Sequence, residues 1–128
     1  MIVVDSSVIV DTVTGTEPRA WDRLLIEQPL AAPTLIDFEV LSALRGLERG
    51  RHLTEPRALD ALSDFEQMTI HRWDTTEPLR RRIFDLRANF SAYDAAYVAL
   101  AEMLDCTLLT RDLRLARAAE RLVAVEAV

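Results

Sequence analysis

Four acidic side chains in this sequence are placed where they suggest chemistry rather than a solvated surface. They are Asp5, Glu39, Asp94 and Asp112. The first and the last follow apolar runs that we predict to be strands, and the other two lie on predicted helices, beside apolar faces. Carboxylate oxygens are preferred ligands of hard cations such as Mg²⁺ and Mn²⁺. Two such ions, about 3.5–4 Å apart, activate a water and stabilise the leaving oxygen of a phosphodiester.

Each of the four also has a structural explanation when it is taken alone. Asp5 and Asp112 suit the capping of the helices that follow them, and Glu39 suits a boundary position from which a charge reaches water. Asp94 stands three residues after Ser91, which is the spacing of a capping box. The four together are harder to explain in this way, because carboxylates gathered at one edge repel each other. All 15 cations of the chain are arginine, so no lysine is available to neutralise them.

The strands and helices that must position these side chains alternate along the chain. Residues 1–4 are an apolar, β-branched run, which is typical of a strand buried on both faces of a parallel sheet. Further strands are predicted at 30–32, 68–72, 107–110 and 122–125, a loop at 11–16, and helices at 17–27, 35–49, 54–67, 92–104 and 113–121, with one more helix opening at 75–78. The alternation predicts an α/β fold, a three-layer α/β/α sandwich with a mostly parallel central sheet. Open sheets of this kind bind ligands at the carboxyl ends of their strands.

The composition is that of an ordinary globular domain. The 128 residues are 50% apolar and 28% charged, which predicts a single domain over residues 1–128. No segment is long enough to cross a bilayer, and the single cysteine, Cys106, cannot form an internal disulfide, so we expect a cytoplasmic protein without membrane attachment. The net charge of -6 argues against binding nucleic acid through a broadly basic surface. A nucleic-acid enzyme stays compatible with this charge, because a bound metal reverses its sign locally.

The acidic positions and their neighbours resemble a known family, the PIN domain. The matching segments are Asp5-Ser6-Ser7, Glu39 on a helix after Pro33, Ala92-Tyr93-Asp94-Ala95 and Thr110-Arg111-Asp112. More narrowly, the chain resembles the VapC toxins of type II toxin–antitoxin pairs over essentially its full length. A single aspartate motif is weak evidence, whereas four motifs in order with fitting elements between them are specific.

The resemblance implies a Mg²⁺- or Mn²⁺-dependent endoribonuclease that hydrolyses RNA phosphodiesters with metal-activated water. It implies that Asp5, Glu39, Asp94 and Asp112, here called the acidic quartet, hold the metal and form the catalytic site. The hydroxyls of Ser6 and Thr110 match supporting positions of the family. The resemblance also implies a homodimer, silenced by a VapB-type antitoxin in a heterotetramer or a larger complex.

Some alternatives stay open at this point. Asp37, two residues before Glu39, is a second-choice ligand, and Arg111, which adjoins the site, is the best candidate for contact with RNA. The alternative function is a non-catalytic PIN-like module that acts through partner-protein or DNA-bound complexes. Such a module is expected to lack part of the quartet, and here all four residues are present. A receiver domain needs a lysine, and a nucleotide-binding fold needs a glycine-rich loop, which the three glycines do not form.

Overall fold

The structure, a computed structural model, describes residues 1–128. Its centre is a five-stranded sheet in the order β3-β2-β1-β4-β5, and every neighbouring pair of strands is parallel. The strands are β1 (Ile2–Val4), β2 (Leu30–Pro33), β3 (Ile70–Trp73), β4 (Thr107–Thr110) and β5 (Val125–Ala127). This sheet confirms the predicted α/β class.

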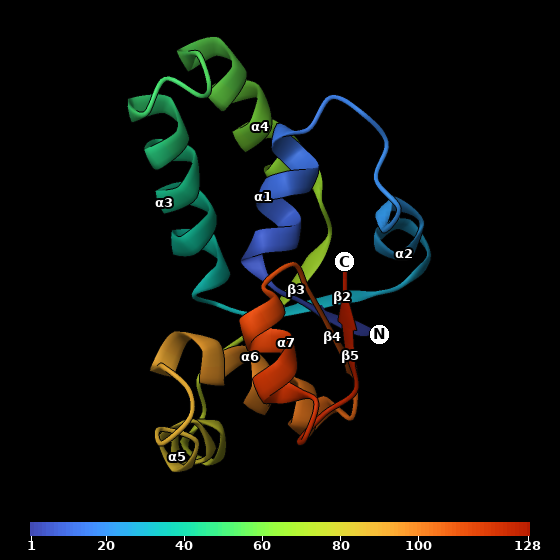
Figure 1. Ribbon diagram of the computed structural model, residues 1–128, viewed down its shortest axis with the longest axis vertical. Helices are drawn as coiled ribbons and strands as arrows, with labels where there is room; N and C mark the ends of the chain where they lie inside the picture. The colour runs from blue at the N-terminus through green and yellow to red at the C-terminus, as the bar shows by residue number, and fades with distance from the viewer.

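Seven helices cover the two faces of the sheet. They are α1 (Ser6–Thr14), α2 (Asp22–Glu27), α3 (Ile36–Arg49), α4 (Glu55–Gln67), α5 (Glu77–Asp85), α6 (Ala92–Leu104) and α7 (Leu113–Ala119). Figure 1 shows α1, α3 and α4 gathered on one side of the sheet and α5, α6 and α7 on the other side. None of the helices is both long and apolar enough to cross a membrane.

The hydrophobic core is centred on strand β1 and the middle of helix α6. β1 is buried along its whole length because its neighbours β2 and β4 pair with it on both sides and helices cover both of its faces. On α6, all residues from Ala95 to Ala101 are buried. The helix predicted at 92–104 is therefore present and its middle is buried on all sides, while Tyr93 and Met103 near its ends are exposed.

Some predicted boundaries were wrong, most clearly near the N-terminus. Residues 11–14 are not a loop but the last turn of α1, where Thr12 and Thr14 donate their hydroxyls to carbonyls four residues back. The helix predicted at 17–27 begins only at Asp22. The reason is that Trp21 donates its indole N–H to Thr12 of α1, which holds the residues before Asp22 against α1 rather than in a helix of their own. The last strand lies at 125–127 rather than at 122–125.

The strand order of the sheet reverses at one switch point, and this point is where such sheets bind ligands. From β1 the chain moves outward to β2 and β3, and it then returns to the opposite side of β1 as β4. The helices that precede this return, α1, α3 and α4, therefore lie on one face of the sheet, and the helices α5, α6 and α7 lie on the other face (Figure 1). In open α/β sheets, the carboxyl ends of the strands at such a point border a crevice that binds ligands. Here those ends are Asp5 after β1 and the segment 110–112 after β4.

Candidate active site

Asp5 lies at the centre of a small network of hydroxyl groups. Its side chain is 7% exposed and accepts hydrogen bonds at Oδ2 from Ser7 Oγ at 2.7 Å and from Thr110 Oγ1 at 2.8 Å. Ser6 Oγ makes a longer contact of 3.5 Å to the other oxygen, Oδ1. Asp5 occupies the capping position of α1 but makes no capping hydrogen bond, so its carboxylate is not consumed by the helix. The hydroxyls of Ser7 and Thr110 therefore hold Asp5 Oδ2 in place, while Asp5 Oδ1 has only the longer contact to Ser6.

Thr110 joins this network to the opposite strand end. Its hydroxyl, which is fully buried, donates to Asp5 and accepts the backbone N–H of Asp112 at 3.0 Å. Asp112 in turn caps α7, because its Oδ1 accepts the N–H groups of Arg114 and Leu115 at 2.9 and 3.1 Å. The capping role considered for Asp112 is thus present. Its Oδ2 has no hydrogen bond within the chain, so one oxygen stays available for other contacts.

Glu39 reaches the site from α3 and is held there by a tyrosine of α6. Tyr97 is 1% exposed and donates its hydroxyl to Glu39 Oε1 at 2.6 Å. Burial, together with the charge of Glu39, raises the pKa of Tyr97 far above its ordinary value, so this hydroxyl always carries its proton. The bond fixes the glutamate on the side of its helix that faces α6.

Asp94 adds the fourth carboxylate from the first turn of α6. Ser91 caps that helix by accepting the Asp94 N–H at 3.2 Å. The side chain of Asp94 has one cationic neighbour, the exposed guanidinium of Arg114, whose Nη2 lies 3.6 Å from Asp94 Oδ2. An ion pair this long and this open to solvent contributes little, so it leaves the charge of Asp94 largely uncompensated.

The electrostatics of the site link Glu39 and Asp94 to the other two carboxylates. Burial raises the pKa of Asp94 most, and the charges of Asp112 and Asp5 raise it further. Burial also raises the pKa of Glu39, with further contributions from Asp5 and Asp94, while the hydrogen bond from Tyr97 opposes that rise. These mutual effects tie together residues 5, 39, 94 and 112. Carboxylates whose pKa values are raised by neighbouring negative charge favour a positive charge beside them, as Glu39 and Asp94 do here.

The donor set of the quartet fits a hard divalent cation in its chemistry. It offers carboxylate and hydroxyl oxygens, with no cysteine or histidine in the cluster, which matches Mg²⁺ or Mn²⁺ rather than Zn²⁺. No three acidic, histidine or cysteine side chains are already arranged closely enough to form a complete metal site. A cation that keeps several of its waters, as Mg²⁺ usually does, needs only one or two direct carboxylate contacts. The set therefore fits such an ion without a closed protein cage.

Two further residues singled out from the sequence have partners elsewhere. Asp37 faces β3, where Arg72 binds its carboxylate with contacts of 2.7 to 2.9 Å, so we leave it outside the proposed ligand set. Arg111 turns its guanidinium toward α1, within 2.6 Å of Asp11 Oδ2 and over the ring of Trp21. Its contact with RNA stays a prediction, and it requires the side chain to leave these partners.

Sequence reasoning missed two members of the network, Ser7 and Tyr97. Ser7 binds Asp5 more closely than Ser6 does, and it also accepts the backbone N–H of Arg111 at 3.1 Å. The available signal was its place in the first turn of a helix that starts at the strand end. Tyr97 follows Asp94 by three residues on one helix, which places both on neighbouring positions of the same face.

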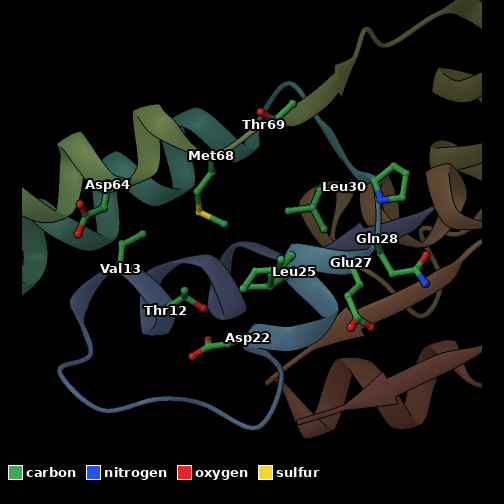
Figure 2. Close-up of a pocket in the computed structure, with 12 residues that line it drawn as sticks. Thr12, Val13, Asp22, Leu25, Glu27, Gln28, Leu30, Asp64, Met68 and Thr69 are labelled. Carbon is green, nitrogen blue, oxygen red and sulfur yellow. The ribbon is translucent and has the colours of Figure 1, made fainter.

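A cavity of about 750 Å³ lies apart from the quartet, between α1, α2 and the junction of α4 with β3. Figure 2 shows the side chains of Leu25 and Met68 pointing into it from α2 and from the end of α4. None of the four quartet residues lines this cavity. Its lining mixes apolar side chains such as Leu25 and Met68 with polar ones such as Asp22 and Asp64.

Comparison with known proteins identifies relatives over most of the chain. A family model described as PIN domain matches residues 2–121. A VapC ribonuclease of Mycobacterium bovis is 39% identical over 115 residues, which is 90% of this chain and 88% of the relative. Ribonuclease VapC1 of Mycobacterium tuberculosis is 39% identical over 118 residues, covering 91% of this chain and 89% of the relative. Ribonuclease VapC12 of the same species is 34% identical over a similar span.

Solved structures share the fold at lower sequence identity. The VapBC2 complex of Rickettsia felis, bound to a promoter DNA fragment, contains a chain with a TM-score of 0.70 and 13% identity, covering 99% of this chain and 98% of that one. FitAcB from Neisseria gonorrhoeae matches with a TM-score of 0.69 and 21% identity, covering 98% and 96%. These likenesses extend over the whole sheet and both helical layers.

Proposed function

Since this chain belongs to the PIN-domain family of VapC ribonucleases, we propose that it is the toxin of a type II toxin–antitoxin pair and acts as an endoribonuclease. The observation that carries the proposal is the gathering of four carboxylates near the switch point of the sheet, where burial and neighbouring carboxylates raise the pKa values of Glu39 and Asp94. A cluster of like charges destabilises a fold. Its presence at the edge where such sheets bind ligands therefore supports a catalytic use.

The PIN-domain family is generally dependent on divalent metal, and we propose Mg²⁺ or Mn²⁺ as the cofactor of this chain. Asp5, Glu39, Asp94 and Asp112 would hold it, and it would supply the Lewis acid and the activated water for attack on the phosphodiester. Thr110 and Ser7 fix the orientation of Asp5, and Ser6 supports its second oxygen. Tyr97 fixes Glu39 and excludes water from its inner side, because its ring is almost fully buried.

We further propose that a VapB-type antitoxin silences the enzyme. The similarity of fold to chains from VapBC and FitAB assemblies supports this partner. The cavity beside α1 and α2, with its mixed apolar and polar lining, offers a surface for an antitoxin segment outside the quartet. A homodimer, a heterotetramer or larger complex with antitoxin, a single domain over residues 1–128 and a cytoplasmic location complete the proposal.

Cleavage of RNA by the purified, antitoxin-free chain tests the proposal. We expect cleavage with Mn²⁺ or Mg²⁺, none with EDTA, and none in the variant Asp94→Asn. The matched control is Asp60→Asn, which removes the same charge from an exposed position on α4. Cleavage that survives in folded Asp94→Asn would contradict the assignment of the site. A chain that binds Mn²⁺ but cleaves no RNA would favour the non-catalytic binding module.

A further inference from the structure

A second groove, outside the acidic quartet, is lined by arginines. It has a volume of about 570 Å³ and lies between α7 and the turn that joins α5 to α6. Its lining includes Arg114, Arg117 and Arg121 on one side and Leu86, Asn89 and Phe90 on the other. We call this surface the α7 groove. In a chain with a net charge of -6, three arginines along one groove are a local reversal of sign.

The arginines of this groove differ from most others in the chain because they lack internal partners. Ten of the 15 arginines have a carboxylate or a backbone carbonyl of the chain within bonding distance. Five have none, namely Arg45, Arg49, Arg51, Arg117 and Arg121. Two of these five lie in the α7 groove, and the third groove arginine, Arg114, has only its long contact to Asp94. The groove thus presents guanidinium groups whose donors are free for an external anion.

The α7 groove lies beside the acidic quartet and is joined to it by Arg114. Arg114 lines the groove, its guanidinium lies 3.6 Å from Asp94, and its backbone N–H binds Asp112. Arg117 follows one turn further along α7, about 4.5 Å along the helix axis. Arg121 follows after the end of the helix, and it lines the same groove. The cations therefore form a row that starts at the carboxylates and leads away from them.

We propose that the α7 groove binds the phosphate backbone of single-stranded RNA beside the bond that is cleaved, with Arg117 and Arg121 as the phosphate contacts. The inference rests on the proposed function, which makes RNA the substrate of the adjoining site. Guanidinium groups bind phosphate oxygens in a two-pronged geometry, and a row of them matches a polymer with one charge per nucleotide. Asn89 supplies a neutral amide for the sugar or base between them. The position of Arg114, which lines the groove and lies beside Asp94, favours RNA over an acidic protein segment.

The test compares two variants that remove the same charge. Arg117→Gln/Arg121→Gln changes the groove, and Arg45→Gln/Arg49→Gln changes two unpartnered, exposed arginines on α3. Binding of a fluorescent single-stranded RNA to the antitoxin-free chain is followed by anisotropy in EDTA, so that it is measured without cleavage. Two lost phosphate contacts should lower the slope of log affinity against log salt by about 1.4. When the salt rises from about 50 to about 200 mM, the factor by which RNA affinity falls should then be about sevenfold smaller for the groove variant than for the parent.

Cleavage supplies a second readout of the same variants. The groove variant should raise KM with little change in kcat, because these contacts bind the substrate and the transition state alike. An unchanged salt slope, an equal loss in the α3 variant, or a parent that binds no RNA at low salt would overturn the proposal. RNA binding that is unchanged while the complex with the cognate antitoxin weakens would assign the groove to the antitoxin instead. A parent that binds RNA through the groove but never cleaves it would refute only the proposed function.

Discussion

Replacing Tyr97 with phenylalanine isolates the hydrogen bond that Tyr97 donates to Glu39. The ring and its packing stay, since only the hydroxyl at 2.6 Å from Glu39 Oε1 is lost. In the parent this bond lowers the pKa of Glu39, against burial and the charges of Asp5 and Asp94, which raise it. Without the bond, the pKa of Glu39 should rise further, so the carboxylate should hold its proton to higher pH.

The size of this effect follows from the energy of a hydrogen bond to a charged group. Such bonds contribute about 1.5–3 kcal/mol, and the half-exposed Glu39 regains part of that from water, so we expect the lower end, about 1.5 kcal/mol. Because one pKa unit corresponds to about 1.36 kcal/mol, the shift should be about one unit. The unfolding free energy should fall by the same amount at neutral pH. This loss should shrink as the pH falls and Glu39 becomes protonated in both proteins.

Calorimetric titration with Mn²⁺ across mildly acidic to neutral pH measures the shift without relying on catalysis. The acid limb of the binding curve should move up by about one pH unit in Tyr97→Phe. The matched control is Tyr93→Phe, which removes a hydroxyl from an exposed tyrosine on the same helix. An unmoved acid limb in Tyr97→Phe, or an equal shift in the control, would refute the role given to this hydrogen bond.

Three other perturbations probe the quartet. Asp94→Asn should raise the Tm of the metal-free chain at neutral pH and not at acid pH, as thermal unfolding in EDTA would measure. The reason is that folding raises the pKa of Asp94, so the ionised carboxylate destabilises the folded chain once the pH has risen through that pKa. Thr110→Val removes the donor to Asp5 and the acceptor of the Asp112 N–H, so it should cost about 2–3 kcal/mol in urea unfolding, while Thr110→Ser should retain most of the stability. Mn²⁺ at about one hundred times its Kd should stabilise the parent by about 2.7 kcal/mol and Asp94→Asn by clearly less, and equal stabilisation of both would place the ion elsewhere.

The parts of the fold that local patterns encode were predicted from the sequence. The β-branched run before Asp5, the helix of 36–49 with its apolar stripe and the Ser91 cap of α6 each depend on residues close together in the chain. The placement of Asp5 and Asp112 at the same edge of the sheet followed from the same patterns, because parallel strands end at one edge, whereas the pairing of β1 with β4 did not. The roles of all four carboxylates stay predictions until they are tested by mutation.

The parts that failed depend on contacts between distant segments. Residues 11–14 look like a polar loop, yet Asp11 faces Arg111, a residue 100 positions away, and α1 continues through it. The pairing of Tyr97 with Glu39 spans 58 positions and is equally invisible in local patterns. The start of α2 was misplaced because Trp21 packs against α1 rather than continuing its own helix.

The position of β1 in the middle of the sheet has a consequence for synthesis of the protein. Ile2 pairs with Leu30 on one side and with Thr107 on the other, so the first strand to leave the ribosome completes its pairing only when β4 has followed. Contacts this distant along a chain form late in folding. The hydrogen bond from Thr110 to Asp5 likewise forms only after β4 has been synthesised and paired with β1. A nascent chain that ends before β4 therefore lacks Thr110 and Asp112, so it has no assembled site.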